Sequence, residues 1–197
     1  MNIYILAKII STIVIVVLVL DVIKSIYNIR ENRKASGSRK MAYIKLAVTI
    51  LITCIVFVLT YVVSIIHVEG KSMEPNYKDN QFVLLNMLNR DYKPGDVIVF
   101  YCPNRGKNLI KRVIATEGDT VEVKDLMLYV NGTLCKENYN TIEFQNDFQK
   151  VTVPKGKIFV MGDNRPISLD SRYTEVGFIN PSNIEGKVIL FNDKKNS

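Results

Sequence analysis

LAVTILITCIVFVLTYVVSIIHVEGKSMEPNY, residues 46–77, joins a long apolar run to a compact polar turn. The run at 46–66 has 21 residues without a charge, and as a helix it would span about 31 Å, close to the hydrocarbon thickness of a bilayer. It predicts a transmembrane helix. The turn at 70–77 places Ser72 six residues beyond the run, where a serine suits a substrate that is itself held in the membrane.

A second apolar stretch, residues 3–23, precedes this run and also predicts a transmembrane helix. Its two charged residues, Lys8 and Asp21, lie near its ends, where a charged group can reach the membrane interface. A cleaved signal peptide is the competing interpretation. The stretch lacks a basic cluster before it and a small-residue cleavage site after it, so we reject that interpretation.

The stretch between the two apolar runs, residues 24–45, carries seven Lys or Arg and one Glu. Short basic loops stay in the cytoplasm, so both termini and everything after residue 66 are expected outside it. This predicts a multi-pass protein of the plasma membrane with an anchor at 1–66. Residues 67–197 carry 18 basic and 17 acidic residues, a balance that argues against a nucleic-acid partner.

From residue 81 onward the chain consists of short segments rich in Val, Ile, Phe and Tyr, many of them separated by Gly, Pro, Asn or Asp. This pattern predicts a mainly antiparallel β-domain at 67–197. Asn131-Gly132 is its strongest hairpin signal, and the polar stretch at 136–150 reads as an irregular loop. Three cysteines exclude a zinc ligand set of cysteines, and Cys102 and Cys135 either pair or remain free thiols.

Four short segments of this domain follow the membrane span in a fixed order. They are GKSMEPNY at 70–77, PGDVIVF at 94–100, IKRVIATEGD at 110–119 and MGDNRPISLDSR at 161–172. In this order they resemble the conserved boxes of bacterial type I signal peptidases, the membrane-anchored Ser/Lys endopeptidases. The resemblance covers residues 68–191. It implies a mainly β fold of signal-peptidase type and the removal of signal peptides from exported preproteins, with no metal or cofactor.

The resemblance assigns Ser72 as the nucleophile and Lys111 as its base. A serine hydroxyl needs a base, and a lysine can act as one only when it is neutral. The apolar residues around Lys111 favour the neutral amine, because burial disfavours the charged form. The one histidine, His67, is far from Lys111 in the sequence, so we do not expect a Ser/His/Asp triad.

Further roles follow from the same resemblance. Ser168 matches a serine that orients the lysine amine, and Gly70 stands where some relatives supply a second oxyanion donor. The residues matching those that brace the site are Arg112, Asp163, Asp170 and Arg172. The residues expected to form pockets for small substrate side chains are Met73, Tyr77 and Ile110.

Two other functions fit parts of the pattern. A self-cleaving repressor also uses a Ser/Lys pair, but the two apolar spans leave no place for its DNA-binding head. A silent peptide-binding β-domain would lack Ser72 or Lys111, and both are present. The expected partners are preproteins and the lipid bilayer. The sequence does not decide whether the secretion machinery is a further partner.

Overall fold

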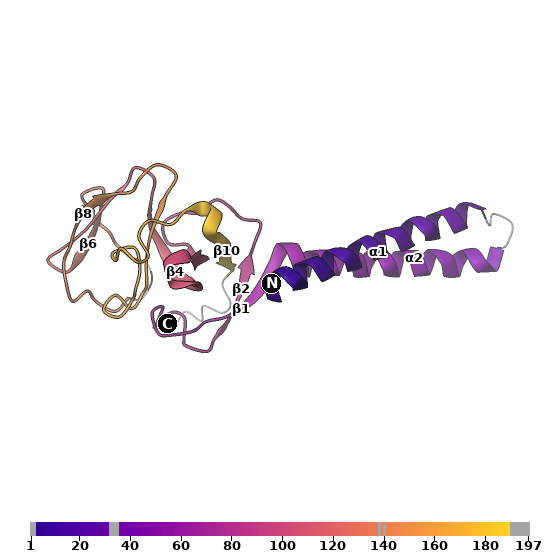
Figure 1. Ribbon diagram of the computed structural model, residues 1–197, viewed down its shortest axis with the longest axis horizontal. Coiled ribbons are helices and arrows are strands. Elements are labelled where there is room, and N and C mark those ends of the chain that lie inside the picture. Colours follow the sequence, from indigo (N-terminus) through magenta and orange to yellow (C-terminus); the bar gives the residue numbers. More distant parts are fainter. Residues whose placement is uncertain (1–2, 32–35, 138, 140, 190–197) are drawn as a thin grey trace. The chain divides into compact units, whose positions relative to one another are not determined.

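The computed structural model describes residues 3–31, 36–137, 139 and 141–189. The chain divides into two compact units, Met1–Ser64 and Ile65–Ser197. The first unit is a pair of helices, α1 (Ile3–Glu31) and α2 (Ser36–Phe57), with a π-helical turn at Val58–Val62 (Figure 1). Residues 10–30 and 40–62 are each long and apolar enough to cross a membrane, and many of their apolar side chains are exposed.

The helix boundaries differ from those expected at 3–23 and 46–66. α1 continues to Glu31 and α2 begins at Ser36, so most of the basic stretch at 24–45 is helical rather than a loop. Lys and Arg are good helix formers, and their charge does not interrupt a helix. At the other end the helical segment stops at Val62, and Val63–His67 forms strand β1, whose backbone pairs with β2 at the edge of the larger sheet.

The second unit contains two sheets, which confirms the predicted mainly β fold. The larger has the strand order β1-β2-β10-β3-β4-β9 and the smaller β7-β6-β5-β8. The larger sheet consists of β1, β2 (Phe82–Asn86), β3 (Val97–Cys102), β4 (Lys107–Thr116), β9 (Ile158–Met161) and β10 (Ile184–Ile189). The smaller consists of β5 (Thr120–Lys124), β6 (Met127–Val130), β7 (Thr133–Leu134) and β8 (Phe148–Thr152). Two 3₁₀ turns, Pro103–Arg105 and Pro181–Asn183, precede β4 and β10.

The expected hairpin turn connects β6 and β7. Asn131 and Gly132 have φ angles of 54° and 75°, the left-handed conformations that a two-residue hairpin turn requires. Cys102 and Cys135 are free thiols, and Cys102 is buried.

Strand β4 has an unusual pairing. Residues 107–112 pair antiparallel with β3, whereas β9 pairs only with residues 112–116. Within the described chain, residues 107–111 therefore have a strand neighbour on one edge only. This half of β4 carries Lys111 and leaves an open edge beside it.

Candidate active site

A closed loop at residues 68–81 carries Ser72, and it is named the nucleophile loop after the role expected of that serine. Its ends are joined by two backbone hydrogen bonds, from the Val68 N–H to the Gln81 carbonyl at 2.8 Å and from the Asn80 N–H to the Val68 carbonyl at 2.9 Å. Inside the loop the Gly70 N–H donates to Asp79 Oδ1 at 2.8 Å. Gly70 has a φ of +88°, which side chains rarely allow, so the turn requires a glycine there.

A second segment, from the 161–172 box, holds this loop in place. The Asn164 N–H donates to the Ser72 carbonyl at 3.1 Å, and its side-chain amide donates to the Lys71 carbonyl at 3.2 Å. The nucleophile loop is thus fixed on both sides of Ser72 by one asparagine.

The side chain of Lys111 extends from β4 to the Ser72 hydroxyl. Its Nζ lies 2.7 Å from Ser72 Oγ and donates to the Ile110 carbonyl at 2.8 Å. The side chain is 3% exposed. Burial lowers the pKa of Lys111 to about 8, against the opposing effect of the Asp170 and Asp163 carboxylates. The amine is therefore substantially neutral at mildly alkaline pH, beside a serine hydroxyl.

Ser168 is buried, and its hydroxyl has no hydrogen-bond partner in the described part of the chain. Gly162 lies between it and the nucleophile loop. A Cβ on Gly162 would lie 2.2 Å from Ser168 Oγ and 2.4 Å from the Ser72 carbonyl oxygen. The structure thus brings Ser168 close to the Ser72 backbone, while a hydrogen bond from Ser168 to the Lys111 amine stays a prediction.

Two Arg–Asp pairs, each with a fully buried carboxylate, supply the two acidic groups that act on Lys111. Arg112 donates from Nε to Asp163 Oδ1 at 2.8 Å and from Nη2 to Oδ2 at 2.6 Å. Asn76 of the nucleophile loop donates to the same Asp163 Oδ2 at 2.7 Å. The Asp163 carboxylate, fully buried, therefore links β4, the 161–172 box and the nucleophile loop.

The other pair joins Arg172 to Asp170. Arg172 donates from Nε to Oδ1 at 2.8 Å and from Nη2 to Oδ2 at 2.9 Å. Asp170 Oδ2 also accepts the Gly162 N–H at 3.0 Å. This pair fixes the glycine on which Ser168 and Ser72 converge.

Ser72 and Lys111 line a cavity of about 300 Å³. The other lining residues are Ile66, His67, Val68, Glu69, Val99, Lys107, Asn108, Leu109 and Ile110. Its walls are thus the end of β1 with the residues after it, and the open-edged half of β4. β1 and β4 occupy distant positions in the sheet order, so the sheet must curl to bring them to one cavity.

Of the three expected pocket residues, only Ile110 lines this cavity. Met73 is fully buried in an apolar cluster with Val68 and Val99, because the turn directs its side chain into the protein interior. Tyr77 lines a different cavity. His67, distant from Lys111 in sequence, does line the Ser72 cavity, but the Ser72 hydroxyl is hydrogen-bonded to Lys111.

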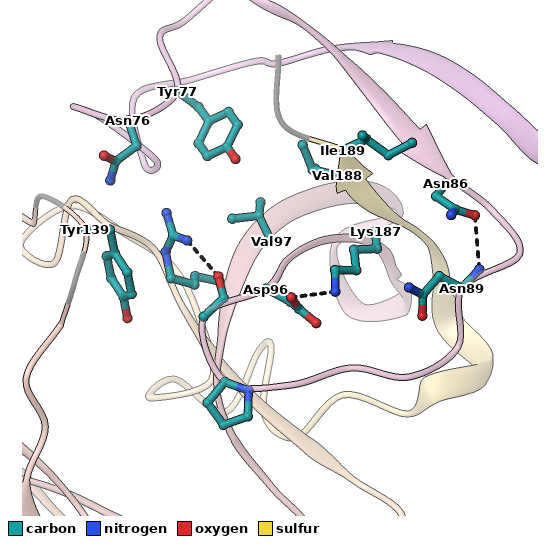
Figure 2. Close-up of a pocket in the computed structure, with 13 residues that line it drawn as sticks. Asn76, Tyr77, Asn86, Asn89, Asp96, Val97, Tyr139, Lys187, Val188 and Ile189 are labelled. Atoms are coloured by element: carbon teal, nitrogen blue, oxygen red, sulfur yellow. Dashed lines mark hydrogen bonds and ion pairs between the residues drawn. The ribbon is translucent and has the colours of Figure 1, made fainter. Parts of the chain in front are cut away.

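The cavity that Tyr77 lines has a volume of about 570 Å³. Figure 2 shows Asn76, Tyr77 and Tyr139 on one side of it and Asn86 and Asn89 on the other. Arg112 lines it, whereas Lys111 lines the cavity with Ser72. Lys111 and Arg112 thus face different cavities, which agrees with the alternation of neighbouring side chains along a strand.

Four residues of the site were not anticipated from the sequence. Gly162 and Asn164 lie in the 161–172 box and Asn76 in the 70–77 turn, but only the fold shows what they contact. Tyr139 lies in the stretch expected to be irregular, with no local signal. Among the described residues, no cluster of three or more His, Cys, Asp or Glu is placed to hold a metal ion.

Comparisons with known proteins agree on one family. The sequence model described as signal peptidase, peptidase S26, matches residues 40–191. A signal peptidase I P from Bacillus subtilis subsp. natto is 33% identical over 170 residues, which cover 80% of this chain and 90% of that one. A signal peptidase IB from Staphylococcus aureus strain Mu50 is 37% identical over 151 residues, covering 65% and 76%.

A solved structure is similar as well. A signal peptidase I from Enterococcus faecalis V583 is 36% identical, with a TM-score of 0.44, and the match covers 51% of this chain and 97% of that one.

Proposed function

Because the chain belongs to the signal peptidase family, peptidase S26, we propose that it is a membrane-bound serine endopeptidase that removes N-terminal signal peptides from preproteins with a Ser72–Lys111 dyad. The observation that carries the dyad is the 2.7 Å contact between Lys111 Nζ and Ser72 Oγ in a buried site. Membership of the family supports the peptide-bond hydrolysis and the preprotein substrate.

In the proposed reaction the neutral Lys111 amine takes the proton of Ser72 Oγ while that oxygen attacks the scissile carbonyl carbon. The tetrahedral intermediate collapses as the Lys111 ammonium gives its proton to the departing amine. The signal peptide is then joined to Ser72 as an ester. Water, deprotonated by Lys111, hydrolyses the ester and restores the serine.

The negative oxygen of the intermediate needs hydrogen-bond donors. The Gly70 N–H, which stands at the position of the expected second donor, already donates to Asp79. Gly70 therefore supplies no donor in this conformation. We assign the backbone N–H of Ser72 as the donor on this loop.

The substrate would enter as an extended strand. The Ser72 cavity lies between the end of β1 and residues 107–111 of β4, whose other edge is free among the described residues. An extended peptide can add to a free strand edge by main-chain hydrogen bonds, with shallow pockets selecting alternate side chains. A cavity of this size, walled by Val99 and Ile110, suits small apolar side chains before the cut.

The two helices of the first unit are proposed to anchor the protein in the plasma membrane as a multi-pass protein. The excess of Lys and Arg at 24–45 supports a cytoplasmic position for that stretch. Both termini and the catalytic domain at 67–197 would then be extracytoplasmic, in contact with the lipid surface and with arriving preproteins.

The test is cleavage of a preprotein by the full chain in lipid vesicles, with the new N-terminus identified by mass spectrometry. We expect cleavage at the signal-peptide junction, its loss in Ser72→Ala, and its retention in Ser182→Ala, a control at an exposed serine. Cleavage by Ser72→Ala at the wild-type rate, or none by the wild type, would contradict the proposal.

A further inference from the structure

The stretch expected to be irregular, 136–150, ends within β8 (Phe148–Thr152), and four residues before that strand, Glu137, Tyr139, Ile142 and Phe144, contact the candidate active site. The ring of Tyr139 covers the Arg112 guanidinium at 3.8 Å from carbon to ring centroid. The Tyr139 hydroxyl donates to Glu137 Oε1 at 2.7 Å, and Glu137 in turn forms an ion pair with the buried Arg165. One short segment thus connects the arginine beside Lys111 to the 161–172 box.

The same segment touches the box at two further points. The Ile142 N–H donates to the Asp163 carbonyl at 3.0 Å. The Phe144 ring lies under two guanidinium groups, those of Arg165 at 4.7 Å and Arg172 at 5.5 Å. The segment therefore contacts both Arg112, which holds the Asp163 carboxylate, and Arg172, which holds the Asp170 carboxylate.

On the basis of the proposed Ser72–Lys111 chemistry, we propose that Tyr139 is a positioning residue, which fixes Arg112 against Asp163 and thereby maintains the environment in which Lys111 serves as base. Arg112 lines the cavity of about 570 Å³, and the Tyr139 ring covers one face of its guanidinium. Removing the ring would open that face to water.

Tyr139 acts at a distance from the substrate. It lines the Arg112 cavity shown in Figure 2 and is not among the residues that line the Ser72 cavity. Its effect must therefore pass through Arg112 and Asp163 rather than through contact with the peptide.

The effect on Lys111 has a definite sign. Burial lowers the pKa of Lys111, the Asp170 and Asp163 carboxylates raise it, and Lys107 lowers it. A displaced Arg112 compensates the Asp163 charge less well and lets water approach the site. Both changes favour the charged amine, so loss of the Tyr139 ring raises the pKa of Lys111.

The test compares Tyr139→Leu, which removes the ring, with Tyr139→Phe, which keeps it. Tyr101→Leu, at an exposed tyrosine of β3, is the matched control. For each full-length variant, kcat and KM for one preprotein are measured against pH and normalised to the active fraction. In Tyr139→Leu we expect the acid limb of kcat/KM to move up by about 0.5 to 1.5 pH units, with KM little changed.

At pH 7 this shift corresponds to a loss of about 3- to 30-fold in kcat/KM, and the loss disappears well above pH 9. Tyr139→Phe and Tyr101→Leu should keep the wild-type limb. A purely structural role for Tyr139 would lower the active fraction and leave the limb unmoved. An unmoved limb in Tyr139→Leu overturns the proposal.

A second readout does not depend on catalysis. The Lys111 amine is titrated by ¹³C NMR of ε-labelled lysine in the full chain in detergent micelles, and its signal is assigned by its absence in Lys111→Arg. A raised pKa in Tyr139→Leu but not in Tyr139→Phe supports the positioning role even if no preprotein is cleaved. Equal values in all three proteins contradict the role even if the wild type is an active peptidase.

Discussion

At the scale of single residues, the site depends on a lysine kept where its charge is unfavourable. Lys111 is 3% exposed, and burial brings its pKa down to about 8 from 10.5. A cation held this way destabilises the fold at neutral pH, because the unfolded chain binds the proton more tightly. The same property suits the amine to the role of base proposed for it, so the proposed catalysis and stability are opposed at this position.

Lys111→Met should therefore be more stable than the wild type at pH 7, by about 1 to 3 kcal/mol. Between pH 8 and 10.5 the unfolded wild-type chain still binds a proton that the folded chain has lost, so wild-type stability rises with pH. The advantage of the methionine variant should shrink over that range. Denaturant unfolding in detergent, followed by near-ultraviolet circular dichroism, measures it. A difference that grows with pH would be inconsistent with a buried, neutral-favouring Lys111.

Gly162 makes a second prediction at this scale. Its missing Cβ leaves room for Ser168 Oγ and the Ser72 carbonyl, so Gly162→Ala should displace both and cost about 1 to 3 kcal/mol. The rate of preprotein cleavage should fall by a larger factor than the fraction of folded protein does. Gly186→Ala is the control, because its Cβ would meet the Asn86 carbonyl at 2.9 Å, away from Ser72. Equal loss of cleavage in the two variants, at equal stability, would show that Gly162 has no special role.

At the scale of elements, β4 organises the site. It directs Lys111 toward the Ser72 cavity and Arg112 toward the other, and its first half keeps a free edge among the described residues. A strand with one free edge can bind a peptide main chain. If the substrate adds to this edge as a strand, its own backbone must contribute hydrogen bonds to binding.

A competitor peptide that spans the cleavage site tests this requirement. Methylation of a backbone nitrogen on the signal-peptide side removes one donor, and a lost hydrogen bond of this kind should weaken inhibition about 5-fold. The same peptide methylated several residues beyond the cut is the control. Inhibition constants that are identical for the unmodified and the two methylated peptides would argue against strand addition.

The strands were predictable from sequence because their signals are local. Runs of Val and Ile bounded by turn residues indicate strands, and Asn131-Gly132 fixes its hairpin through its own φ preferences. The extent of the helices was not predictable from sequence. Basic residues such as those at 24–45 indicate which side of the membrane a stretch occupies, but they are also good helix formers, so they do not mark where a helix ends.

The candidate site, too, was predictable from the sequence only in part. Ser72 and Lys111 were assigned through four short boxes, and the structure places their side chains in contact. The contacts of Asn76 and Tyr139 join segments far apart in the chain, and no local pattern encodes them. The burial of Met73 likewise depends on how the turn is oriented against the sheet.

At the scale of the whole molecule, the connection between anchor and site is short. The helical segment ends at Val62, so Ser72 follows ten residues later, a reach of at most about 35 Å. An enzyme and a substrate held on one membrane surface meet at a raised effective concentration. We propose that the two apolar helices, acting as a membrane anchor, contribute to efficiency through this confinement.

A truncated chain that begins at Val63, which keeps β1 whole, measures this contribution. On a preprotein in lipid vesicles it should have a specificity constant at least about tenfold below that of the full chain. On a short soluble peptide the two should be similar. Equal constants on the vesicle-bound preprotein would mean that the anchor does not position Ser72.

The most direct test of the Ser72–Lys111 dyad is the pH dependence of preprotein cleavage by the full chain in vesicles, compared with Lys111→Arg. Arginine keeps the charge but cannot lose its proton. The wild type should show an acid limb of unit slope with a midpoint near the Lys111 pKa of about 8. Lys111→Arg should fold normally and show no turnover at any pH. Turnover by Lys111→Arg with the same limb would show that another group is the base.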